Sequence, residues 1–191
     1  MEYKINENIH GIECSFTTND NCFSPKNVDR GTLAMLSVCE IKQGETVIDL
    51  GCGYGVVGIW AAHYTAPENI YMLELNPDAV ACAKINAVQN GFERLNIRES
   101  NGYENLDCAG FDVILSNPPY HTDFSVAKMF IEKGFNRLKV GGRMYMVTKR
   151  LDWYKNKLSA IFGGVKVMEI DGYYVFVAEK RSVQRAKSKK K

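Results

Sequence analysis

Long hydrophobic runs are missing from this sequence of 191 residues. Its longest apolar stretches, such as residues 144–147, fall far short of the roughly 20 residues that a membrane-spanning helix needs. The first eight residues have neither the basic start nor the apolar stretch of a secretory signal. We therefore expect a cytoplasmic protein without a membrane partner.

Paired cysteines are missing as well. The six cysteines are scattered, and no two of them have the Cys-x-x-Cys spacing of a zinc site or a redox pair. The sequence therefore predicts free thiols in a reducing compartment and no bound metal.

Charge of one sign dominates only at the carboxyl end. Seven Lys or Arg and no acid lie between Lys180 and Lys191, so residues 1–179 keep 17 basic against 22 acidic side chains. A like-charged run cannot fold by itself, and we expect residues 180–191 to form a basic, disordered tail. Two uses stay open for this tail: a solubilising end, or an arm that binds nucleic acid by releasing counterions.

Internal repeats and interior linkers rich in Pro, Gly or Ser are also absent, while 46% of the residues are hydrophobic, which is enough to bury one core. Short β-branched runs alternate with stretches of helical period along most of the chain. Such alternation is typical of a parallel sheet with helices on both faces. Strands are expected at residues 46–50, 70–75, 94–99, 112–116 and 143–148, and helices at 56–64, 78–90, 125–138 and 153–162.

The carboxyl-terminal part departs from this alternation. Residues 166–170 and 173–177 flank Asp171-Gly172, a strong signal for a hairpin of antiparallel strands. We therefore predict an α/β, Rossmann-like fold in which a seven-stranded mixed sheet carries an antiparallel hairpin at its carboxyl-terminal end.

About 45 residues precede the first parallel strand. They are expected to hold a small hairpin, formed by residues 9–16 and 21–23, and a helix near 28–39. The chain then divides, within a single domain, into an amino-terminal extension or lid (1–45), a core (46–179) and the basic tail (180–191).

A glycine-rich turn, Asp49-Leu50-Gly51-Cys52-Gly53-Tyr54-Gly55, follows the first core strand. Glycines there let the backbone turn sharply and approach a ligand without interference from a Cβ atom. Glu74 ends the next strand 21 residues after Gly53, where a carboxylate can accept hydrogen bonds from both ribose hydroxyls of an adenosine. The run from Gly53 to Gly58 also fits the G-x-G-x-x-G fingerprint, so a nicotinamide or flavin cofactor stays open at this point.

The fourth core strand runs straight into Asn117-Pro118-Pro119-Tyr120-His121. At the carboxyl end of a parallel sheet, this segment faces the same crevice as the glycine turn and Glu74. The three segments, in this order, resemble the class I S-adenosylmethionine-dependent methyltransferases that methylate planar or amide nitrogens. The resemblance extends over residues 23–179 and disfavours the nicotinamide cofactor.

The resemblance implies S-adenosylmethionine as the cofactor. The Asn117 side-chain oxygen and the Pro118 carbonyl would accept the hydrogens of the target amine and aim its lone pair at the sulfonium methyl. Tyr120 would offer a flat face to the target ring. The implied catalytic residues are Asn117, Pro118, Pro119 and Tyr120, and the implied cofactor-binding residues are Asp49, Gly51, Cys52, Gly53, Gly55, Glu74, Asn101, Gly102 and Asn117.

More closely, the chain is similar to the methyltransferase small-domain group, whose members include ribosomal RNA guanine-N2 methyltransferases. The similarity lies in Asn117–His121 and in the segment from Cys22 to Thr32. It implies RNA, of the ribosomal kind, as the partner, and it specifies no oligomeric state. Within the amino-terminal segment, the residues that would border the cofactor are Phe23, Ser24, Gly31 and Thr32.

Three alternatives to guanine N2 stay open. Adenine-N6 methyltransferases of RNA or DNA and protein-glutamine N5 methyltransferases carry the same Asn-Pro-Pro-Tyr sequence. A catalytically silent, cofactor-binding partner subunit is the non-enzyme alternative. An intact Asn117–Tyr120 segment argues against it, because a silent copy has no chemical need for those residues.

Overall fold

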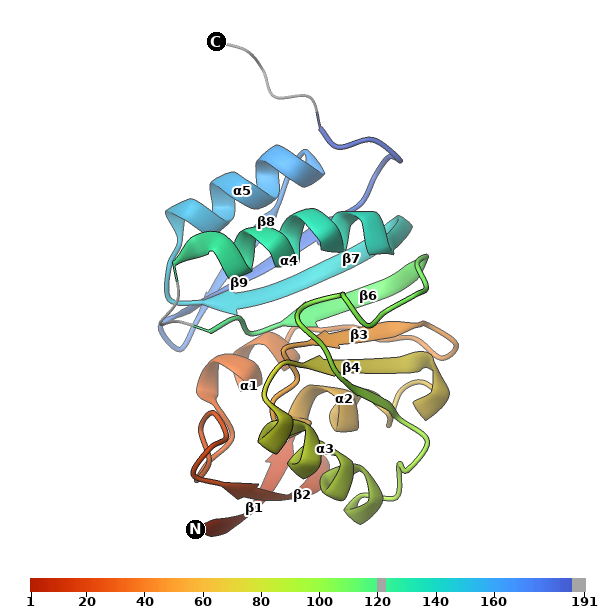
Figure 1. Ribbon diagram of the computed structural model, residues 1–191. Helices are drawn as coiled ribbons and strands as arrows, with labels where there is room; N and C mark the ends of the chain where they lie inside the picture. The colour runs from red at the N-terminus through yellow and green to blue at the C-terminus, as the bar shows by residue number, and fades with distance from the viewer. Residues whose placement is uncertain (120–122, 187–191) are drawn as a thin grey trace.

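The computed structural model describes residues 1–119 and 123–186 (Figure 1). Its centre is a seven-stranded sheet in the order β5-β4-β3-β6-β7-β9-β8. Strands β3 to β7 are parallel to one another, whereas β9 pairs antiparallel with both β7 and β8, so the predicted fold class is confirmed. The strands of this sheet are β3 (Val47–Leu50), β4 (Ile70–Glu74), β5 (Asn96–Glu99), β6 (Phe111–Ser116), β7 (Leu138–Thr148), β8 (Lys166–Ile170) and β9 (Tyr173–Glu179).

Helices cover both faces of the sheet (Figure 1). Successive strand residues point to opposite faces: Ile48 packs with α4 and α5, whereas Val47 packs with α1, α2 and α3. In the part of the chain that the structure describes, no helix is long and apolar enough to cross a membrane. The helices are α1 (Arg30–Leu36), α2 (Val56–Ala61), the short 3-10 helix η1 (Pro67–Asn69), α3 (Pro77–Gln89), α4 (Phe124–Arg137) and α5 (Asp152–Phe162).

The amino-terminal hairpin differs from the prediction. Its strands are β1 (Glu2–Ile9) and β2 (Ile12–Asn19), joined at His10-Gly11, so the expected strand at 21–23 is wrong. The strand β1 was not predicted because only Ile5 and Ile9 of its eight residues are buried. These two residues lie four positions apart, so the sequence does not show the alternation of apolar and polar residues that marks a strand.

Asn86, a fully buried residue of α3, joins this hairpin to the core. Its side-chain oxygen accepts from the Thr17 N–H at 2.7 Å, and its side-chain nitrogen donates to the carbonyls of Thr17, at 3.0 Å, and Tyr54, at 2.8 Å. Because Tyr54 belongs to the glycine turn, one buried amide connects the hairpin, α3 and that turn. Phe16 and Met35 are also buried in the same cluster as Val47, so the amino-terminal extension shares the hydrophobic core.

Lys180 corrects the predicted tail. We expected it in an exposed, disordered segment, but it is buried, and its ammonium donates to the carbonyls of Phe135 and Leu138, both at 2.8 Å. These carbonyls lie at the end of α4, where backbone oxygens lack partners within the helix and a cation is favoured. Residues 187–191 of the predicted tail lie outside the described residues.

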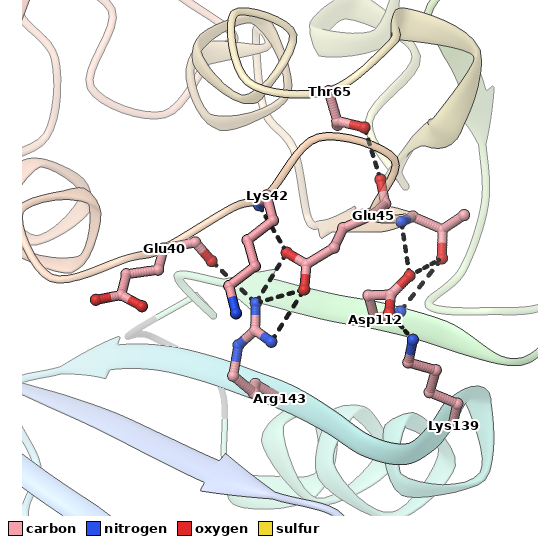
Figure 2. A network of polar contacts seen from close by, with 8 residues as sticks. Glu40, Lys42, Glu45, Thr65, Asp112, Lys139 and Arg143 are labelled. Atoms are coloured by element: carbon pink, nitrogen blue, oxygen red, sulfur yellow. Dashed lines mark hydrogen bonds and ion pairs between the residues drawn. The ribbon is translucent and has the colours of Figure 1, made fainter.

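A polar network fastens the edge of the sheet where the parallel strands begin (Figure 2). Arg143 of β7 binds the carboxylate of Glu45 at 3.0 Å and the Glu40 carbonyl at 3.0 Å. On β6, Asp112 accepts from the Thr46 N–H at 2.9 Å. The loop before β3 is therefore held against β6 and β7, and the opposite, carboxyl edge is left for the site.

Candidate active site

The candidate site lies where the strand order reverses. From β3 the chain moves to β4 and β5 on one side, and to β6 and β7 on the other. Connections on the two sides diverge at such a point, so a crevice opens outside the carboxyl ends of β3 and β6. The glycine turn after β3, Glu74 at the end of β4 and Asn117 after β6 all lie at this edge.

The glycine turn needs its glycines. Gly51, Gly53 and Gly55 have φ values of 71°, 54° and 105°, a left-handed conformation that side chains with a Cβ atom disfavour. Asp49 accepts a hydrogen bond from the N–H of Gly58 in α2 at 2.8 Å, which fixes the turn from below the crevice.

Glu74 is held in place by two backbone donors. One carboxylate oxygen accepts from the Gly53 N–H at 2.8 Å, and the other accepts from the Asn76 N–H at 2.9 Å. A carboxylate oxygen has more than one lone pair, so each can accept a further hydrogen from a ligand. The arrangement suits the predicted recognition of two ribose hydroxyls.

Asn117 has a fixed orientation. Its side-chain nitrogen donates to the Asp29 carboxylate at 2.8 Å and to the Thr32 hydroxyl oxygen at 3.0 Å. A carboxylate can only accept, so it selects the nitrogen end of the amide. Within residues 1–119 and 123–186, no group donates a hydrogen bond to the Asn117 side-chain oxygen, which is buried beside the cavity that Asn117 lines.

Asp29 is positioned by the helix that it begins. It caps α1, and its carboxylate accepts from the Thr32 N–H at 3.0 Å. Thr32 follows one turn later, so the cap and the first turn of α1 together present two acceptors to Asn117.

A cavity of about 340 Å³ joins these groups, within the range of small-molecule sites. All the predicted cofactor-binding residues line it except Gly55, which begins α2 instead. Gly31 does not line it either: a Cβ atom there would lie 2.8 Å from the Tyr173 ring, so this glycine permits close packing. Tyr120 lies outside the described residues. The predicted residues that line the cavity are Phe23, Ser24, Thr32, Asp49, Gly51, Cys52, Gly53, Glu74, Asn101, Gly102, Asn117, Pro118 and Pro119.

The cavity is acidic. Asp29, Asp49 and Glu74 contribute carboxylates, and none of the described residues that line it is Lys or Arg. Burial raises the pKa of Asp49 to about 7, the nearby charge of Glu74 acts in the same direction, and the Gly58 N–H opposes them. Such a site favours a cationic ligand and disfavours the pyrophosphate of a nicotinamide or flavin dinucleotide.

Sequence reasoning missed several residues of the cavity. Asp29 lies within the segment from Cys22 to Thr32 but was not among the residues expected at the site, and its separation of 88 positions from Asn117 concealed their contact. Val126 and Phe130 lie on one face of α4, four residues apart, and line the cavity from that helix. Their spacing signals a buried helix face, and nothing in it distinguishes core from ligand contact.

The strand order and this crevice are those of the class I S-adenosylmethionine-dependent methyltransferases. The sequence profile of the methyltransferase small domain matches residues 13–177, so the chain belongs to that family.

Individual relatives agree with this assignment. The chain is 33% identical to the protein YbxB of Bacillus subtilis strain 168, over 90% of this chain and 89% of that one. It is 29% identical to the ribosomal RNA small subunit methyltransferase C of Psychromonas ingrahamii, over 84% of this chain and 46% of that one. A solved T. thermophilus 16S rRNA N2 methyltransferase, in complex with AdoMet and guanosine, superposes with a TM-score of 0.88 at 28% identity, over 95% of this chain and 51% of that one. This chain therefore spans about half the length of these two RNA methyltransferases.

Proposed function

We propose that this protein transfers the methyl group of S-adenosylmethionine to the exocyclic N2 amine of guanine in ribosomal RNA, in the cytoplasm. The proposal rests on the Asn117 side-chain oxygen, which is buried beside the cavity and has no hydrogen-bond partner among the described residues, while Asp29 and Thr32 hold the nitrogen of the same amide. An unsatisfied buried acceptor is costly, so it is expected to have a donor when the site is occupied.

The chemistry requires such an acceptor. The lone pair of an exocyclic amine on a base is delocalised into the ring, which makes the amine a poor nucleophile. Hydrogen bonds from the amine to the Asn117 oxygen and to the Pro118 carbonyl would hold both N–H bonds and direct the lone pair out of the ring plane. Pro118 and Pro119 restrict the backbone at this point, so the second acceptor is also rigid.

The cofactor would occupy the glycine-turn side of the cavity. S-adenosylmethionine supplies an electrophilic methyl group on a sulfonium cation, and the carboxylates of Asp49 and Glu74 suit that positive charge. Glu74, already fixed by two backbone donors, would accept from the ribose hydroxyls. Asn101 and Gly102 follow β5 and would contact the adenine.

The relatives support the choice of guanine N2. The T. thermophilus relative is described as a 16S rRNA N2 methyltransferase in complex with AdoMet and guanosine. An enzyme cannot reach the amine of a base that is stacked inside a nucleic-acid duplex, so a paired target guanine would have to leave its stack, at a cost of a few kcal/mol.

The test is methyl transfer from labelled S-adenosylmethionine to total RNA and to total protein from cells that lack this protein, followed by nucleoside analysis. Label in N2-methylguanosine is the expected result. Label in N6-methyladenosine would keep the two proposed acceptors of the amine, Asn117 and Pro118, here called the amine clamp. It would change the target base from guanine to adenine. Label only in protein, or no label although the cofactor binds, would contradict the proposal. The Asn117→Ala protein serves as the matched control, because it keeps the cavity and removes the acceptor.

A further inference from the structure

Two adjacent cations, Lys149 and Arg150, follow the end of β7 at the same edge as the site. In the β6–β7 pair Ser116 lies opposite Met146, and in the β7–β9 pair Thr148 lies opposite Tyr174. The residues after Thr148 are therefore level with the segment after Ser116 that begins with Asn117, and with the start of β9.

Each cation lies over an aromatic ring. The Lys149 ammonium is 5.0 Å from the centre of the Tyr173 ring, and the Arg150 guanidinium carbon is 5.0 Å from the centre of the Phe124 ring. Phe124 in turn stacks on Trp153, with ring centres 4.4 Å apart and an angle of 13° between the planes. Cation–π contacts of this kind restrain two long side chains that are otherwise exposed.

These rings adjoin the amine clamp. A Cβ atom on Gly31 would lie 2.8 Å from the Tyr173 ring and 2.9 Å from the Asp29 carboxylate, so Tyr173 packs directly against the beginning of α1. Phe124 begins α4, two residues before Val126, which lines the cavity. The two cation–aromatic pairs thus lie next to residues that line the cavity, one pair beside Asp29 and the other at the start of α4.

Neither cation has an ion-pair partner in the part of the chain that the structure describes. Among residues 1–119 and 123–186, no carboxylate forms an ion pair with Lys149 or Arg150, whereas Lys139, Arg143 and Lys157 each have one. Residues 1–179 as a whole carry more acidic than basic side chains. Two restrained cations that lie beside the crevice, without an ion pair to a described carboxylate, therefore favour an anionic partner there.

We propose that Phe124, Lys149, Arg150, Trp153 and Tyr173, here called the β7-end platform, bind the single-stranded nucleotides that flank the target base. This inference rests on the proposed function, and it adds the path that the RNA strand takes across the protein surface beside the cavity. Cations interleaved with half-buried aromatic rings suit an unpaired strand, because the cations contact phosphates while guanidinium and ring planes stack on bases. A duplex would present stacked, inaccessible bases to the same surface.

The test measures RNA affinity across a salt series by fluorescence anisotropy, with a random single-stranded RNA of about 12 nucleotides and its duplex as probes. The double variant Lys149→Gln/Arg150→Gln is compared with Lys84→Gln, which removes an exposed cation from α3. We expect the double variant to bind the single strand about 10-fold to 100-fold more weakly, with a log–log salt slope lower by about 1.4, since each phosphate contact contributes about 0.7. Lys84→Gln should change neither value.

A second variant separates stacking from charge. Arg150→Lys keeps the charge and loses the planar guanidinium, so the salt slope should stay the same while single-strand affinity falls severalfold. Affinity and slope unchanged in the double variant would overturn the platform, as would a wild-type protein that prefers the duplex or binds only protein substrates.

Measurements of cofactor affinity and of methyl transfer distinguish a failure of the platform from a failure of the proposed function. If the wild-type chain methylates RNA while the double variant binds and methylates equally well, only the platform is wrong. If the wild-type chain binds the single strand through these residues but methylates no RNA, the platform stands and the proposed function is wrong. The double variant should bind S-adenosylmethionine like the wild type, because none of its changed residues lines the cavity.

Discussion

The side-chain nitrogen of Asn117 donates to the carboxylate of Asp29 at 2.8 Å, although 88 residues separate the two in the sequence. This contact fixes the orientation of the Asn117 amide, so that its oxygen is the end without a partner among the described residues. Asp29, the cap of α1, thereby orients the Asn117 amide, whose oxygen we propose as an acceptor for the target amine.

Replacement of Asn117 by Ala should abolish most methyl transfer. Loss of one preorganised hydrogen-bonding group typically lowers kcat about 100-fold or more, and here it also leaves the amine unpositioned. The affinity for S-adenosylmethionine should stay within a few-fold of wild type. Transfer of a labelled methyl group measures the loss of kcat, and calorimetry measures the affinity for the cofactor. Wild-type kcat in this variant would remove the amine clamp from the mechanism.

The variant Asp29→Asn should lower kcat about tenfold without unfolding α1, because Asn caps a helix as well as Asp does. An amide at position 29 can present either its oxygen or its nitrogen, so it no longer selects the nitrogen end of Asn117. Thr32→Val, which removes the second acceptor, should act in the same direction. Thermal unfolding provides the control. A lower Tm with unchanged kcat would show that Asp29 only stabilises the helix.

Glu74→Gln should weaken cofactor binding about 10-fold to 100-fold, the effect of losing hydrogen bonds to a charged group. The amide nitrogen of the new side chain would also face one of the two backbone donors that hold Glu74 now, Gly53 or Asn76. At saturating S-adenosylmethionine, kcat should change little. Calorimetry with S-adenosylhomocysteine measures the affinity, and a wild-type value would mean that Glu74 does not contact the ribose.

Asp49 makes folding stability depend on pH. Burial raises its pKa to about 7 in the folded protein, well above the value of about 3.9 that an exposed Asp has when the chain is unfolded. Between these values the folded state binds more protons, so this group's contribution falls as the pH rises, by an amount on the order of a few kcal/mol.

The measurement is the free energy of unfolding in urea at about pH 4.5 and about pH 7.5, for wild type and Asp49→Asn. Other carboxyl groups change stability equally in both proteins, so the difference between the two pH profiles isolates Asp49. The variant should gain stability relative to wild type as the pH rises. Parallel profiles would show that Asp49 is ionised throughout.

Two truncations separate the structural from the charged part of the tail. Removal of residues 187–191 should leave the free energy of unfolding unchanged. Removal of 180–191 also deletes Lys180 and its hydrogen bonds to the end of α4, and should cost about 1–3 kcal/mol. If the tail contacts phosphates, both truncations should lower the salt slope of RNA binding. Equal stability of the two truncated proteins would contradict the buried role of Lys180.

Local signals in the sequence were sufficient for the sheet and for the segments at its carboxyl edge, whereas other cavity residues, such as Asn101 and Gly102, were expected only from the family resemblance. Gly51 and Gly53 follow a β-branched strand, Glu74 ends a second strand of the same sheet, and Asn117 follows a third, so their shared edge follows from topology alone. The prediction for β1 was wrong because polar residues on both faces conceal its period, and the packing of its partner strand β2 on α3 is recognisable only in three dimensions.

The remaining features depend on long-range contacts. Lys180 looked like the first residue of a basic run, since composition cannot show that two carbonyls at the end of α4 need a donor. The contact between Asp29 and Asn117 likewise requires α1 to pack against the end of β6. Contacts between segments that are distant along the chain leave no local pattern in a single sequence, so they could not be predicted.

A crystal structure of this chain with S-adenosylhomocysteine and guanosine would test the proposed role of Asn117 directly. We expect the guanine exocyclic nitrogen about 2.7–3.2 Å from the Asn117 side-chain oxygen, with the nitrogen of that amide still bound to Asp29. A guanosine whose amine faces away from Asn117, or an Asn117 amide with its oxygen and nitrogen exchanged, would show that Asn117 does not accept from the target amine.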